Sequence, residues 1–169
     1  IEVVGDIALS VDALSDALGS RLDLDLTEFE MVRDNVKDKI FQLADETTFP
    51  MRPQNIVAEI RNLMGYHDII ALDNGVYKIW FARNYLAYQP NTILLDNALA
   101  TMGAGLPSAM LAAMIYPNRK VMSICGDGGF MMNSQEIETA VRLNLNMVVL
   151  ILNDSSYGMI RWKPVSYTH

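Results

Sequence analysis

Two largely apolar runs, residues 121–125 and 147–152, lie on either side of a segment with the periodicity of a helix. Asn133 is followed three residues later by Glu136, a pairing typical of a helix start. The apolar residues of this segment have the spacing of one helix face: Ile137, Ala140, Val141 and Leu145. A helix this short between two apolar strands predicts a right-handed βαβ unit whose parallel strands are buried on both faces.

Each strand of this unit is followed by a short polar turn. Residues 126–129 are Gly-Asp-Gly-Gly, and Asn153-Asp154 follows the second strand. Because the carboxyl ends of neighbouring parallel strands meet at one edge of a sheet, we expect Asp127 and Asp154 to lie close together. Open α/β sheets bind their ligands at this edge.

The residue types in the two turns favour a site for a metal and a diphosphate. Carboxylates and backbone carbonyls are hard oxygen ligands, which suit Mg²⁺ or Ca²⁺ better than Zn²⁺, and Mg²⁺ with few protein ligands usually bridges to phosphate oxygens. Gly126, Gly128, Gly129 and Gly158 allow backbone N–H groups to approach such an anion. A Gly-Asp-Gly sequence alone is commonly only a tight turn, so the hypothesis depends on the pairing of the two turns.

Two further apolar runs also end in short polar residues, Asp73-Asn74 and Asp96-Asn97. We therefore expect four strand ends to deliver polar groups to one edge of a parallel sheet. For Asp73 and Asp96 the simpler interpretation is turn formation or helix capping, at which Asp and Asn are both favoured.

The other segments predict elements in a regular order. These are a strand at 2–5, a helix capped by Ser10 and ended by Gly19, a helix that starts with Thr27 and Glu30, a hinge at 47–53, a helix from Pro53 to Gly65, a strand at 68–73, a helix at 79–85, a strand at 92–95 and a helix at 103–116. The buried face of the helix from Pro53 is expected to be Ile56, Ile60, Leu63 and Met64. The helix at 103–116 is apolar nearly all round and is expected to be buried.

Composition excludes several classes of protein. A single cysteine, Cys125, rules out a disulfide framework, and its place in an apolar run indicates a small core residue rather than a reactive thiol. No apolar run approaches the ~20 residues of a membrane span, and residues 1–6 have no signal-peptide character. The net charge of −7 is concentrated in residues 1–46, and no basic face for nucleic acid is evident. We expect a cytoplasmic protein that binds neither membrane nor nucleic acid.

The sequences GDGGFMMNSQEIETAVRLNLN and ILNDSSYGMIRW resemble those of thiamine diphosphate (ThDP) enzymes, most closely the large or catabolic subunits of acetolactate synthases. The resemblance continues upstream through DNGVYKIWFARN and LDNALATMGAGLPSAM and covers residues 52–162. It implies an α/β fold with three layers, α/β/α, around a mostly parallel sheet. It also implies that residues 1–20 end a preceding middle domain, 21–52 form a helical linker, and 53–169 form a diphosphate-binding domain that is incomplete at its C-terminus.

The resemblance also implies the roles of individual residues. Asp127, Asp154 and the backbone carbonyl of Ser156 would bind Mg²⁺. The Ala100 carbonyl and the Met102 N–H would bind the aminopyrimidine ring of ThDP, while the Met102 side chain would hold the cofactor bent. The implied cofactor-binding residues are Gly75, Val76, Tyr77, Ala100, Met102, Gly126, Asp127, Gly128, Gly129, Asp154, Ser156, Tyr157, Gly158 and Met159.

No catalytic residue is assigned within the chain. The family activates the pyrimidine with a Glu from another domain, and Glu136 and Glu138 are better interpreted as a helix cap and a surface residue. The chain alone is therefore expected to be inactive. In the family the complete enzyme, a homodimer or homotetramer, decarboxylates pyruvate or another 2-oxoacid, and acetolactate synthases join the product to a second pyruvate to give 2-acetolactate. Whether FAD is bound, and whether the role is biosynthetic or catabolic, stays open.

One local difference bears on the substrate. Biosynthetic relatives have a Trp that helps to select 2-oxobutyrate, whereas Trp162 lies one position earlier here and Lys163 occupies the selecting position. Because one residue turns a helical side chain by about 100°, we expect little preference for 2-oxobutyrate. Residues 164–169 do not align with the family. The alternatives are another ThDP-dependent decarboxylase, oxidase or carboligase, a noncatalytic Mg²⁺–phosphate-binding module, and a domain that serves chiefly in assembly.

Overall fold

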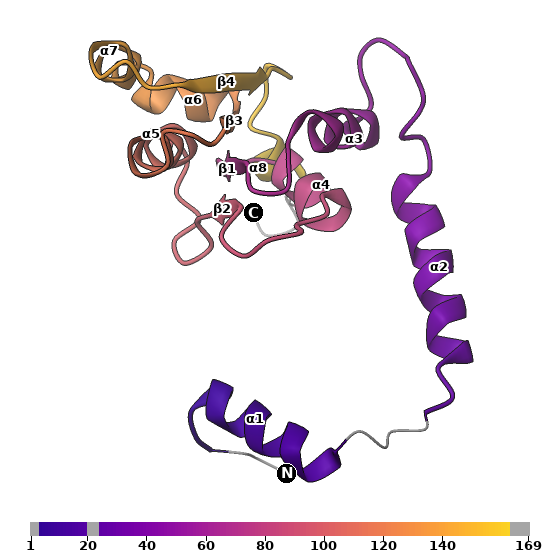
Figure 1. Cartoon of the computed structure of the whole chain (residues 1–169). Coiled ribbons are helices and arrows are strands. Elements are labelled where there is room, and N and C mark those ends of the chain that lie inside the picture. The colour runs from indigo at the N-terminus through magenta and orange to yellow at the C-terminus, as the bar shows by residue number, and fades with distance from the viewer. Residues whose placement is uncertain (1–3, 20–23, 163–169) are drawn as a thin grey trace, which may run out of the picture. The chain divides into compact units, whose positions relative to one another are not determined.

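The computed structural model describes residues 4–19 and 24–162. The chain divides into two compact units, Ile1–Asp38 and Lys39–His169. The second unit contains the sheet (Figure 1).

The N-terminal unit contains helix α1 (Ile7–Leu18) and most of α2 (Thr27–Phe41). Asp6 caps α1, because its carboxylate accepts the Leu9 N–H at 3.0 Å, so the prediction that Ser10 is the cap was wrong. Gly19 ends the helix as predicted, with φ +60°. Helix α2 begins at Thr27, whose N–H donates to the Asp25 carboxylate at 3.0 Å. The strand predicted at 2–5 lies mostly outside the described residues, and neither Val4 nor Gly5 is in a strand.

The second unit is built on a four-stranded parallel sheet of order β2-β1-β3-β4. Its strands are β1 (Ile69–Leu72), β2 (Ile93–Leu95), β3 (Val121–Gly126) and β4 (Met147–Leu152). The helices are α3 (Pro53–Leu63), α4 (Tyr77–Asn84), α5 (Gly105–Ile115), α6 (Asp127–Asn133), α7 (Glu136–Arg142) and α8 (Gly158–Trp162). This parallel sheet with flanking helices confirms the predicted α/β fold.

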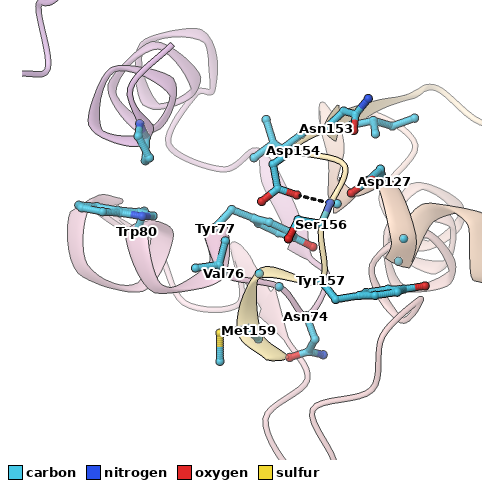
Figure 2. Close-up of a pocket in the computed structure, with 18 of the residues that line it drawn as sticks. Asn74, Val76, Tyr77, Trp80, Asp127, Asn153, Asp154, Ser156, Tyr157 and Met159 are labelled. Atoms are coloured by element: carbon cyan, nitrogen blue, oxygen red, sulfur yellow. Dashed lines mark hydrogen bonds between the residues drawn. The ribbon is translucent and has the colours of Figure 1, made fainter. Parts of the chain in front are cut away.

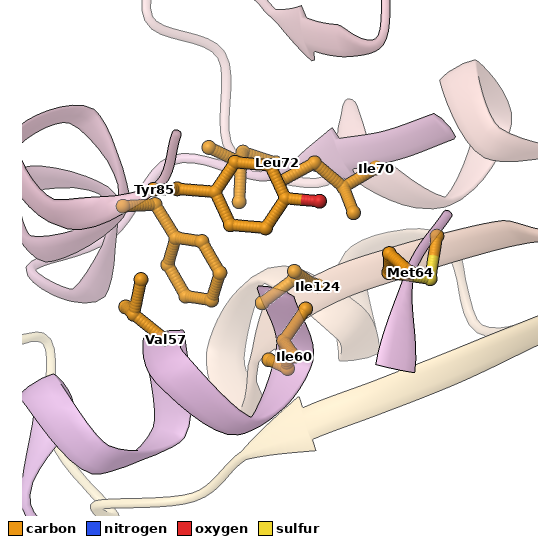
Figure 3. Packing of buried hydrophobic residues seen from close by; sticks show 8 residues of the cluster. Val57, Ile60, Met64, Ile70, Leu72, Tyr85 and Ile124 are labelled. Atoms are coloured by element: carbon orange, nitrogen blue, oxygen red, sulfur yellow. The ribbon is translucent and has the colours of Figure 1, made fainter. Parts of the chain in front are cut away.

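Helices cover both faces of the sheet, because successive strand residues point to opposite sides. On one face, Ile70, Leu72 and Ile124 pack against α3 and α4 in a cluster that includes Val57, Ile60, Met64, Phe81 and Tyr85 (Figure 3). On the other face, Ile69, Ala71 and Val121 pack against the alanines of α5, Ala109, Ala112 and Ala113. The small side chains of α5 allow this helix to approach the sheet closely.

Burial departs from the sequence-based expectation at three elements. Strand β4 is not buried on both faces: Val148 and Ile151 are 57% and 41% exposed. The reason is that β4 is an edge strand, with no described strand paired to its outer side. On α5, Leu111 and Met114 are exposed, so this helix buries only the side that meets the sheet and helices α6 and α7. Leu63, at the end of α3, is 63% exposed because it lies off the helix face that carries Val57 and Ile60.

The segment between β3 and β4 also differs from the prediction. A helix, α6, begins at Asp127 directly after β3, so residues 127–129 form its first turn rather than a separate loop. Asn133 is the last residue of α6 and does not cap α7, which starts after Gln135. The Asn133 side chain instead donates to the Gly103 carbonyl at 2.7 Å.

Cys125 is fully buried in β3, as predicted. Burial raises the pKa of its thiol to about 11, and the charge of Asp73 acts in the same direction. The thiol therefore stays protonated and serves as a small core side chain. Among the helices of the described residues, none combines the length and apolar character that crossing a bilayer requires.

Candidate functional site

The strand register places the polar strand ends at one edge of the sheet. Leu72 of β1 pairs with both Leu95 and Ile124, so Asp73 and Asp96 follow paired residues. Gly126 pairs with Leu152, so Asp127 and Asn153 each come directly after the last pair of β3 and β4. The expected gathering of four polar strand ends is therefore observed.

A cavity of about 480 Å³ opens at this edge. The loops that follow β1 and β4, together with the first turn of α6 after β3, form its polar part, and Figure 2 shows Asp127, Asp154 and Ser156 there. Of the implied cofactor-binding residues, the cavity is lined by Gly75, Val76, Tyr77, Met102, Gly126, Asp127, Gly128, Gly129, Asp154, Ser156, Tyr157, Gly158 and Met159. Ala100 is not among the lining residues. It lies in the segment just before Met102.

The loop after β4 is shaped by two successive side-chain turns. The Asn153 Oδ1 accepts the Ser155 N–H at 2.9 Å. The Asp154 Oδ1 accepts the Ser156 N–H at 3.1 Å, the bond drawn in Figure 2. Asn and Asp favour such turns because their short side chains bond the backbone two residues further on. The second bond engages one oxygen of Asp154, and the other carboxylate oxygen has no hydrogen bond within the described residues.

Glycines keep the cavity walls open, because a Cβ at these positions would displace the side chains beside them. A Cβ at Gly128 would lie 2.6 Å from the Tyr157 ring, and one at Gly75 would overlap the Tyr77 ring. At Gly158 a Cβ would lie 3.0 Å from Val76, so the loops after β1 and β4 touch there. Backbone groups are thus exposed to the cavity at positions where side chains would cover them.

The donor set fits a hard cation and an anion together. Asp127 and Asp154 offer carboxylate oxygens, and the first-turn N–H groups of α6 have no helical acceptor. Within the described residues no three His, Cys, Asp or Glu side chains converge, so a metal here would take its remaining ligands from backbone carbonyls and from the anion. Mg²⁺ bound to a diphosphate has this requirement.

Tyr77 lies between the polar and apolar parts of the cavity. Its hydroxyl is buried and has no hydrogen-bond partner within the described residues. Burial raises the pKa of this phenol, and the charge of Asp73 raises it further. The side chain is therefore a neutral phenol at physiological pH and adds no charge to the site.

The sequence analysis missed one wall of the cavity. This wall is apolar and consists of Phe49, Pro50, Met51, Pro53, Ile56, Trp80, Phe81 and Ile160. Residues 49–53 belong to the hinge predicted at 47–53, where two prolines close together indicate a loop but not what the loop contacts. Asn74 and Asn153 also line the cavity. Asn153 directly follows β4, and Asn74 is the second residue after β1. A polar residue at a strand end is the available signal at both positions; it favours turn formation at Asp73-Asn74 and is part of the predicted metal site at Asn153-Asp154.

This chain belongs to the thiamine pyrophosphate enzyme family. Residues 73–169 match the family model described as "Thiamine pyrophosphate enzyme, C-terminal TPP binding domain". The match begins at Asp73 and includes all the loops that form the polar part of the cavity. The family resemblance noted in the sequence is thereby confirmed.

Similar proteins are acetolactate synthases. The chain is 33% identical over 165 residues to the catabolic acetolactate synthase of Raoultella terrigena, and this alignment covers 95% of this chain and 29% of that protein. It is 38% identical over 122 residues to the acetolactate synthase of Bacillus subtilis, and this alignment covers 72% of this chain and 21% of that protein. It is 32% identical over 171 residues to the chloroplastic acetolactate synthase of Arabidopsis thaliana, and this alignment covers 99% of this chain and 26% of that protein. The chain thus spans less than a third of the length of these relatives.

Proposed function

We propose that the cavity binds Mg²⁺ and the diphosphate of ThDP. The observation that carries the proposal is the convergence of Asp127 and Asp154 with two glycine-bearing loops in one cavity. Asp127, Asp154 and the Ser156 carbonyl are the metal ligands. Backbone N–H groups of the first turn of α6 and of the loops after β1 and β4 hold the diphosphate, and the Met102 segment holds the aminopyrimidine.

ThDP supplies the chemistry that removes CO₂ from a 2-oxoacid and transfers the remaining unit, while the protein binds and orients the cofactor. Asp127 and Asp154 fix the metal, and the glycine loops exclude side chains from the place of the anion. Residues 53–169 act as the diphosphate-binding domain, after a linker at 21–52 and the end of a middle domain at 1–20. The pyrimidine-activating carboxylate comes from another domain of the full-length protein.

For the full-length protein we propose acetolactate synthase activity, in which two pyruvate molecules give 2-acetolactate and CO₂ in a homodimer or homotetramer. The names and extent of the similar proteins support this step. Another ThDP-dependent carboligase or decarboxylase would use the same cofactor site but release a different product from pyruvate.

Binding should depend on metal, because two carboxylates alone would repel a diphosphate. We expect titration calorimetry of the full-length protein to give at least about tenfold tighter ThDP binding with Mg²⁺ than with a chelator. Equal affinity under the two conditions would contradict the proposed metal site. Binding of adenine nucleotides in place of ThDP would favour a noncatalytic phosphate-binding module.

The substrate preference is tested by competition between pyruvate and 2-oxobutyrate. Helix α8 ends at Trp162, and Lys163, which occupies the selecting position, lies outside the described residues. We expect the full-length protein, offered the two 2-oxoacids at equal concentration, to form acetolactate and acetohydroxybutyrate in comparable amounts. A strong excess of acetohydroxybutyrate would show that the register assigned to Trp162 and Lys163 is wrong.

A further inference from the structure

The two residues that flank Met102 are held on both sides by side chains. The Thr101 N–H donates to the Asp96 Oδ2 at 3.3 Å, and the Thr101 carbonyl accepts from the Asn74 Nδ2 at 2.7 Å. The Gly103 N–H donates to the Asp73 Oδ1 at 2.8 Å, and the Gly103 carbonyl accepts from the Asn133 Nδ2 at 2.7 Å. All four backbone groups around Met102 are therefore fixed by side chains.

These four side chains come from three parts of the fold. Asp73 and Asn74 follow β1, Asp96 follows β2, and Asn133 ends α6. Asn74 is itself oriented by Lys78, whose ammonium donates to the Asn74 Oδ1 and also to the Asp96 carbonyl, the latter at 3.0 Å. Because the amide oxygen faces a donor, the amide NH₂ must face the Thr101 carbonyl.

The backbone of this segment needs such support. Ala100 has φ +51° and Gly103 has φ +86°, so a left-handed residue stands at each end of the pair Thr101-Met102. Left-handed conformations are unfavourable for residues other than glycine and persist where surrounding contacts impose them. Asp73 is fully buried, so this contact in particular is protected from water.

Met102 is left free by this arrangement. It lines the cavity, and its own N–H and carbonyl make no hydrogen bond within the described residues. Thr101 and Gly103 are fixed by hydrogen bonds, and Met102 between them has free backbone groups. The segment is therefore preorganised to present Met102 to a ligand. Such preorganisation raises affinity because the ordering cost is already met in the free protein.

We propose that Asp73, Asn74, Asp96 and Asn133 are positioning residues that hold Met102 for the aminopyrimidine end of ThDP. This inference rests on the proposed function, since it deepens the role of the same cavity. It separates two parts of cofactor binding: the carboxylates and glycine loops bind the diphosphate, and the four side chains act only on the ring end.

The test compares two ligands in the full-length protein, ThDP and inorganic diphosphate, each titrated with Mg²⁺. In Asn133→Asp the donor to the Gly103 carbonyl is replaced by an acceptor of the same shape. We expect this variant to bind ThDP about tenfold more weakly, the usual effect of losing one partly buried hydrogen bond and leaving its acceptor without a donor. Its affinity for Mg²⁺–diphosphate should match that of the wild type. Asn118→Asp, on an exposed turn, makes the same chemical change and should alter neither affinity.

A second pair guards against misfolding of the first variant. Asp96→Ala removes the acceptor of the Thr101 N–H at a partly exposed position and should also weaken ThDP selectively. Asp96→Asn keeps an acceptor oxygen and should restore near-normal affinity. Unchanged ThDP affinity in Asn133→Asp and Asp96→Ala would overturn the inference, as would an equal loss for ThDP and diphosphate, which indicates a global effect. If the wild type binds diphosphate but not ThDP, the proposed cofactor itself is wrong and the inference fails with it.

Discussion

Replacing Asp127 by Ala is expected to lower the affinity of the full-length protein for ThDP in the presence of Mg²⁺ by at least about 100-fold. Groups that only support a metal ligand cost 10–100-fold when they are removed, so loss of a ligand should reach or exceed the upper value, about 100-fold. Asp127 stands at the start of α6, directly after the last residue pair of β3 and β4. No other carboxylate among the described lining residues of the cavity, apart from Asp154, can replace it.

The loss of ThDP affinity should depend on which side-chain oxygens remain at position 127. Asp127→Asn keeps one oxygen but loses the charge, so its affinity should fall between those of the wild type and Asp127→Ala. Asp45→Ala, at an exposed position away from the cavity, is the matched control and should bind like the wild type. Calorimetric titration with ThDP at fixed Mg²⁺, with thermal unfolding to verify folding, measures these effects. Wild-type affinity in Asp127→Ala would contradict the proposed metal ligand.

Much of the domain could be predicted because its strands are continuous apolar runs that end in polar pairs. The run at 147–152 became β4 with the same bounds, and the glycine-rich turn after β3 fell at the cavity. In a parallel sheet the carboxyl ends of neighbouring strands lie at the same edge, so the shared location of Asp127 and Asp154 could be predicted from the order of the elements along the chain.

What could not be predicted depends on contacts between distant segments. Asn133 has the local pattern of a helix cap, yet its partner is the carbonyl of Gly103, thirty residues away in sequence. Asp73 looked like an ordinary turn residue, but it is fully buried because Gly103 and Asn74 supply N–H groups to its carboxylate. The exposure of β4 could not be predicted either, because an apolar run does not show whether another strand pairs with its outer side.

The second large expected effect is a loss of folding stability in Gly129→Ala, and it results from contact with the buried carboxylate of Asp73. A Cβ at Gly129 would overlap the Asp73 Oδ2 and lie 3.1 Å from its Cγ. Asp73 cannot easily move away, because it is fully buried and bonded to two backbone N–H groups. We therefore expect Gly129→Ala to lower the free energy of unfolding by roughly 2–4 kcal/mol, from overpacking together with weakened hydrogen bonds to a charged group.

Gly128→Ala is the matched control for this effect. Gly128 and Gly129 are neighbours in the first turn of α6, so each substitution gains a similar helix propensity, at most about 1 kcal/mol. A Cβ at Gly128 would meet only the ring of Tyr157, which is 55% exposed and can swing aside. Chemical denaturation of both variants should therefore show Gly128→Ala close to the wild type or slightly more stable, and Gly129→Ala clearly less stable. Equal stability of the two variants would show that the Asp73 carboxylate is free to move and does not fix the segment that carries Gly103.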